Sequence, residues 1–166
     1  MDYAKLLLQG QPDTILQCLT YWVDDELFAM NINRVREIIQ HASMTVVPLM
    51  PSFVRGVINL RGSVVPVIDL RARLGRSPTP LGKKTSIIIL DVSREGERLD
   101  LGVMVDAVSE VIEVRQSQIE SPPNFGTSID RDYLQGVAKV AGQFVGILDT
   151  ERALSMDEMA QLVATQ

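Results

Sequence analysis

The chain has only one cysteine and one histidine among its 166 residues. Cys18 has no partner for a disulfide within the chain, and its apolar surroundings predict a buried thiol. Metal sites need clusters of His, Cys or carboxylate ligands, and nucleophilic catalysis needs a base beside Ser or Cys. His41 lies in a polar stretch with neither pattern around it. The sequence therefore predicts no metal site, no catalytic residue and no cofactor.

The chain also lacks an excess of basic residues and a long apolar run. Its formal net charge is −5, which disfavours nucleic-acid binding because that affinity comes largely from basic side chains on phosphates. No apolar stretch approaches the roughly 20 residues of a membrane span, and Leu6 to Leu8 is too short for a signal peptide. With 46% hydrophobic residues, the chain is expected to be globular, soluble and cytoplasmic, without membrane insertion.

The glycine-rich segment 56–63 lacks the lysine that a phosphate-binding loop places beside its last glycine. Four aspartates are available for acid–base catalysis, but they lie at the ends of expected strands, where capping or turn formation is favoured. These aspartates are Asp69, Asp91, Asp106 and Asp149. A protein that works by contact is therefore the leading hypothesis, and a small β-barrel enzyme or ligand-binding domain is the alternative.

The clearest motif in the sequence occurs twice, at residues 56–69 and again at 136–149 without a gap. Internal similarity of this kind indicates that one structural unit is built twice. The identical pairs are Gly56 and Gly136, Val57 and Val137, Gly62 and Gly142, Val65 and Val145, and Asp69 and Asp149. The similarity extends upstream, where residues 29–39 align with residues 102–112.

Each copy contains about five short strands by its pattern of β-branched residues and turns. In the first copy, Arg61-Gly62 joins strands 57–60 and 63–68 as a tight hairpin. Pro66 has no N–H to donate, which predicts a sheet edge or a bend at that strand. Five strands with one apolar face close most economically into a small barrel, so the fold is expected to be mainly β, with two such units.

The segment 75–82 is rich in Pro and Gly, divides the chain into two lobes and is expected to be exposed. Ser155 and Glu158 have the spacing of a capping box, which predicts a C-terminal helix, and a short turn is expected at Leu70 to Leu74. The expected organisation is an N-terminal tail at 1–13, a domain at 14–155 with lobes at 14–75 and 85–155 around a linker at 76–84, and a terminal helix or tail at 156–166.

Arg61 is the strongest candidate for a contact residue because the second copy has Ala141 at the matched position. Arg61 is either a solvated turn residue of little value to stability or an interface anchor, whose loss commonly costs about 2 kcal/mol or more. Phe125, in a polar stretch, is either a lid over the second lobe or an exposed anchor. Glu37 matches Glu110 in the second copy, so a role in the fold stays open.

Several segments in fixed order strongly resemble the CheW family of bacterial chemotaxis coupling proteins. They are residues 35–39, 47–48, 51–62, 65–70 and 101–108, within a similarity that covers roughly 14–155. The resemblance implies two packed five-stranded, SH3-like barrels. It also implies a non-enzymatic adaptor that links the cytoplasmic hairpin tips of chemoreceptors to the regulatory domain of the histidine kinase CheA in receptor arrays.

The resemblance also implies which residues bind each partner. Receptor contacts carry over to Gly56, Arg61, Val103, Val105 and Val111. Kinase contacts carry over to Val35, Glu37 and Ile38, with a second kinase contact at residues 120–125, including Glu120 and Phe125.

Overall fold

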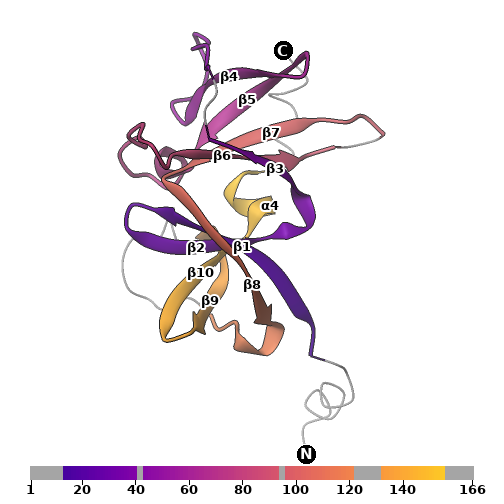
Figure 1. Ribbon diagram of the computed structural model, residues 1–166, viewed down its shortest axis with the longest axis vertical. Helices are drawn as coiled ribbons and strands as arrows, with labels where there is room; N and C mark the ends of the chain where they lie inside the picture. Colours follow the sequence, from indigo (N-terminus) through magenta and orange to yellow (C-terminus); the bar gives the residue numbers. More distant parts are fainter. Residues whose placement is uncertain (1–12, 41–42, 94–95, 122–131, 156–166) are drawn as a thin grey trace, which may run out of the picture.

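The computed structural model describes residues 13–40, 43–93, 96–121 and 132–155, which form strands and a few short helices (Figure 1). The first-copy elements are β1 (Ile15–Val23), β2 (Glu26–Asn31), η1 (Ile32–Arg34), β3 (Val35–Ile39), β4 (Val54–Leu60), β5 (Ser63–Asp69) and α2 (Leu70–Arg73). The second-copy elements are β6 (Ser86–Asp91), β7 (Asp100–Val105), β8 (Ala107–Arg115), η2 (Gln116–Gln118), β9 (Leu134–Val140), β10 (Gln143–Leu148) and α4 (Thr150–Ala153).

The ten strands of the described residues form two five-stranded sheets with the same connectivity. One sheet has the order β8-β1-β2-β10-β9 and is called the β1 barrel; the other has the order β3-β6-β7-β5-β4 and is called the β6 barrel. In each, one parallel pairing, β2 with β10 or β7 with β5, joins antiparallel neighbours. The predicted fold class of two packed five-stranded units is confirmed.

The two sheets do not coincide with the expected lobes, because each takes strands from both copies. The β1 barrel combines β1 and β2 with β8 to β10, and the β6 barrel combines β3 to β5 with β6 and β7. The chain crosses between barrels at η1 and again at Asp106, in the middle of each copy. The strands β3 and β8, which follow the two crossings, are similar in sequence. Each pairs with the first strand of the other copy, β3 with β6 and β8 with β1, and not with the first strand of its own copy.

A short backbone bridge closes each sheet into a barrel. The Thr45 N–H donates to the Val57 carbonyl of β4 at 2.8 Å, and the Glu120 N–H donates to the Val137 carbonyl of β9 at 2.9 Å. A Cβ atom on Gly56 would lie 2.6 Å from the Thr45 oxygen, and one on Gly136 would lie 2.5 Å from the Glu120 oxygen. The paired glycines are therefore required where the closing segment crosses the strand.

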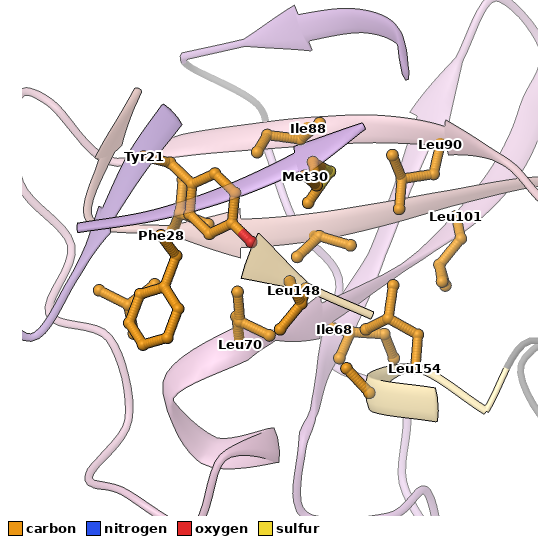
Figure 2. Close-up of a cluster of buried hydrophobic side chains, with 14 of the residues drawn as sticks. Tyr21, Phe28, Met30, Ile68, Leu70, Ile88, Leu90, Leu101, Leu148 and Leu154 are labelled. Carbon is orange, nitrogen blue, oxygen red and sulfur yellow. The ribbon is translucent and has the colours of Figure 1, made fainter. Parts of the chain in front are cut away.

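The core has three parts because the central strands are buried on both faces. Successive side chains of a strand point to opposite faces. In β1, Cys18 therefore packs inside the β1 barrel, while Leu19 and Tyr21 pack between the barrels. Figure 2 shows this inter-barrel core, to which both copies contribute. The predicted burial of the Cys18 thiol is confirmed, and burial raises its pKa.

The aspartates at strand ends stabilise turns and short helices, as their positions predict. Asp69 accepts a hydrogen bond from the Ala72 N–H as the N-cap of α2, and Asp149 accepts one from the Arg152 N–H as the N-cap of α4. Helix α2 corresponds to the short turn expected after Asp69. No helix within the described residues is long and apolar enough to cross a membrane.

Two local expectations differ from the structure. Pro66 lies in β5 between β4 and β7, not on an edge strand, and it precedes the residues of β5 that pair with β7, which begin at Val67. In the linker, Thr79 is buried because its N–H and hydroxyl both bind the Asp69 carboxylate. The N-terminal residues 1–12 and the expected C-terminal helix lie outside the described residues.

The Tyr21 hydroxyl is buried in the inter-barrel core and has no hydrogen-bond partner among the described residues (Figure 2). A buried polar group without a partner costs about 1–3 kcal/mol. Tyr21→Phe removes this group and keeps the ring, so we expect a free energy of unfolding higher by about 1 kcal/mol. Thermal and denaturant unfolding measure the change, and a lower melting temperature would show that the hydroxyl forms a stabilising bond.

Candidate functional site

Arg61 occupies the first position of the β4–β5 turn with a φ of 51°, and Ala141 has the same φ in the β9–β10 turn. In both turns a glycine follows with positive φ, and in the first turn the Asn59 side chain accepts a hydrogen bond from Gly62 N–H. The predicted hairpin is confirmed. Because both copies form the same turn, the turn itself does not need the arginine side chain.

The structure brings Arg61 and Glu37 together although they lie 24 residues apart in the chain. The Arg61 Nη2 atom donates to Glu37 Oε1 at 2.6 Å, which joins the β4–β5 turn to β3. The Arg61 side chain is 73% exposed, so solvent screens the pair and its effect on stability is small. The pair instead fixes the position of a cation and an anion at the protein surface.

Apolar side chains are exposed beside this ion pair in sequence. Ile38 follows Glu37 on β3 and Val64 lies in β5 just after the turn, and both are exposed. Since Ile38 is the next residue on the strand, its side chain points to the opposite face of β3 from Glu37. We call the Arg61–Glu37 pair the Arg61 surface. Exposed arginine and exposed apolar side chains are both typical of contact regions between proteins.

Two of the predicted receptor contacts do not reach the surface of the protein. Val103 and Val105 lie on β7 in the inter-barrel core and are fully buried, so neither presents a side chain to a partner. Gly56 is buried and serves the closure of the β6 barrel. Val111, on β8, is 50% exposed and available for contact.

The predicted kinase contacts differ in exposure. Val35 is partly buried against the inter-barrel core, whereas Glu37 and Ile38 reach solvent. Glu120 uses its backbone to close the β1 barrel and leaves its side chain exposed. Phe125 lies outside the described residues.

Comparison of the two copies reveals two exposed apolar residues, Val64 and Phe144, that the sequence alone did not single out. They occupy the same position after the turn glycine, as Ile38 and Val111 occupy matched positions on β3 and β8. Lys139 Nζ lies 5.7 Å from the Phe144 ring centroid. The signal was present in the repeat, since Val64 and Phe144 each alternate with a buried valine, which places them on the outer face.

A cavity of about 480 Å³ lies at the end of the β6 barrel. Its lining residues are Gln40, Ser43, Met44, Leu81, Gly82, Thr85, Ile87 and Met104. None of these residues has an acidic or basic side chain, whereas an enzyme site needs converging titratable groups. Within the described ranges there is also no group of His, Cys, Asp and Glu side chains that would hold a metal ion.

The sequence model of the protein family described as the CheW-like domain matches residues 17–158 of this chain. The chain belongs to the CheW family. It is 34% identical over 159 residues to the probable chemotaxis protein CheW of Rhizobium etli, which covers 95% of this chain and 97% of the relative. Chemotaxis protein CheW of Klebsiella aerogenes is 32% identical over 142 residues, which cover 86% of this chain and 83% of the relative.

The crystal structure of the scaffolding protein TtCheW from Thermoanaerobacter tengcongensis matches with a TM-score of 0.71 and 34% identity. The match covers 82% of this chain and 90% of that one. The function of the chain is therefore that of a chemotaxis coupling adaptor, and the CheW relatives do not favour the enzyme or ligand-binding alternative.

Proposed function

We propose that this protein couples the cytoplasmic tips of chemoreceptors to the regulatory domain of a CheA-type histidine kinase, by binding both and without catalysing a reaction. It acts in the cytoplasm within receptor arrays, through a domain at residues 14–155. The observation that carries this proposal is the Arg61–Glu37 pair, an exposed ion pair that the repeated turn does not need.

In this proposal the receptor binds at Arg61, with Val111 as a further contact. Arginine is enriched among interface residues whose loss weakens binding most, because its guanidinium forms several directed hydrogen bonds. The kinase binds at Glu37 and Ile38 on β3, and Glu120 and Phe125 form the second kinase contact. Because Arg61 donates to Glu37, binding of a partner to one of them changes the environment of the other.

Binding to both partners is the direct test of the adaptor function. The immobilised protein should retain the kinase regulatory domain and the receptor signalling fragment from the same organism, separately and together. Failure to retain either cognate partner would contradict the proposal, because an adaptor requires both contacts.

Arg61→Ala should leave the melting temperature nearly unchanged, since Ala141 adopts the same φ of 51° in the matched turn. Loss of an interface arginine commonly costs about 2 kcal/mol, so receptor affinity should fall about 30-fold and receptor-dependent kinase activity with it. Lys139→Ala is the matched control, because it removes an exposed cation from the other hairpin. A large fall in melting temperature with Arg61→Ala would assign this residue to the fold.

A further inference from the structure

The cavity at the end of the β6 barrel is not used by the proposed receptor and kinase contacts. Its floor consists of Ile87 and Met104, which are buried core residues of this barrel, and Met44 packs against the same core. Its rim includes Leu81, whose side chain is 68% exposed. An exposed leucine beside an opening into an apolar core forms a binding site for one apolar side chain.

In the sequence, two lysines lie between the lining residues Gly82 and Thr85. Lys83 and Lys84 are both exposed, and neither forms an ion pair within the part of the chain that the structure describes. The turn that carries them is held by the Thr85 hydroxyl, which donates to the Pro80 carbonyl at 3.1 Å and accepts from the Gly82 N–H at 2.8 Å. The site therefore holds two available positive charges on an ordered turn, in a chain of net charge −5.

We propose that this cavity binds an acidic peptide segment of a protein partner, which inserts one apolar side chain between Leu81 and Met44 and places its carboxylates near Lys83 and Lys84. The lining residues that the structure describes carry no charge, which matches an apolar side chain, and the two lysines complement acidic neighbours in the peptide. A small molecule is buried over most of its surface in its site. This cavity is open to solvent, so it would cover a bound group on one side only. That suits one side chain of a larger peptide better than a small molecule.

The test uses the full-length protein and a synthetic eight-residue peptide with one central leucine flanked by aspartates. With methyl-labelled methionine, NMR should show the signals of Met44 and Met104 shifting on titration, because both side chains line the cavity. The signal of Met30, buried in the inter-barrel core, should stay in place and serves as the internal control. Absence of shifts at Met44 and Met104 at millimolar peptide would overturn the proposal.

Variants and peptide controls separate the two parts of the site. Lys83→Glu with Lys84→Glu should weaken binding at least about tenfold and remove most of its dependence on salt. Lys139→Glu, a charge reversal on the distant hairpin, should not change it. A peptide with serine in place of leucine, or lysines in place of aspartates, should bind at least about tenfold more weakly. Equal affinity for any of these would refute the assigned chemistry.

Two further measurements distinguish the peptide from a small ligand and its site from the Arg61 surface. Hexanoate carries a carboxylate on an apolar chain, and equal or tighter binding of hexanoate with the same methyl shifts would replace the peptide by a small carboxylate ligand. Arg61→Ala should leave peptide binding unchanged, because Arg61 does not line the cavity. The peptide site can therefore be confirmed or refuted independently of the adaptor contacts at the Arg61 surface. Loss of peptide binding in Arg61→Ala would contradict this separation.

Discussion

Asp69→Ala is expected to lower the free energy of unfolding by about 3 kcal/mol and the melting temperature by about 6–12 °C. The Asp69 carboxylate is almost fully buried and accepts hydrogen bonds from Arg55 Nη1 at 2.7 Å, Thr79 N–H at 2.9 Å and Thr79 Oγ1 at 2.6 Å. It also caps α2. Removal of one partner from a buried charged network leaves the others unpaired, which is among the more costly single changes in a protein.

The same substitution at Asp149 provides a matched control within the chain. Asp149 caps α4 as Asp69 caps α2, but its side chain is 31% exposed, and the side-chain Nε atom of Arg152 lies 4.0 Å from its Oδ2 atom. Loss of an N-cap alone costs about 1 kcal/mol. Denaturant unfolding of both variants should therefore show a clearly larger loss for Asp69→Ala. Equal losses would mean that the Arg55 and Thr79 contacts contribute nothing beyond the shared cap.

The sequence predicts those features that local residue chemistry determines. The Arg61-Gly62 turn follows from glycine at a position of positive φ, and the caps at Asp69 and Asp149 follow from aspartate at the end of an apolar strand. The repeat predicts two similar units because strands, turns and caps recur at equal spacing. Each of these signals extends over only a few residues, so it can be recognised in the sequence without knowledge of the tertiary structure.

The exposure of predicted contact residues cannot be read from the same patterns. Val103 and Val105 belong to a family motif, but a motif records that a residue is required at a position and not whether its side chain faces solvent. Both faces of β7 are buried, one inside the β6 barrel and one between the barrels, so alternation gives no sign of an outer face. The Arg61–Glu37 pair likewise joins distant parts of the chain.

The exchange of strands between the copies is also invisible in the sequence. The edge strand β3 pairs with β6, and the matching edge strand β8 pairs with β1. Because β1 and β6 are related by the repeat, an unexchanged pairing of β3 with β1 would satisfy the same apolar pattern. Only the short links at η1 and Asp106, which carry the chain from one barrel to the other, distinguish the two arrangements.

This exchange predicts that neither half of the chain folds alone. A cut between Lys83 and Lys84 falls in an exposed turn, yet it leaves residues 1–83 with two strands of the β1 barrel and three of the β6 barrel. Each fragment would lack part of both sheets and would expose the inter-barrel core, to which both halves contribute. An isolated two-stranded hairpin is marginally stable at best, so the incomplete barrels have no independent source of stability.

We therefore expect no cooperative thermal transition for residues 1–83 or 84–166 alone, and recovery of a single transition after equimolar mixing. Near-ultraviolet circular dichroism follows the packing of Tyr21 and its neighbours in the core. The control is the full chain cut at the same bond after folding, which should keep its tertiary signal because the cut leaves both barrels assembled. If residues 1–83 unfolded cooperatively by themselves, a contiguous five-stranded lobe would exist and the exchanged sheets would be refuted.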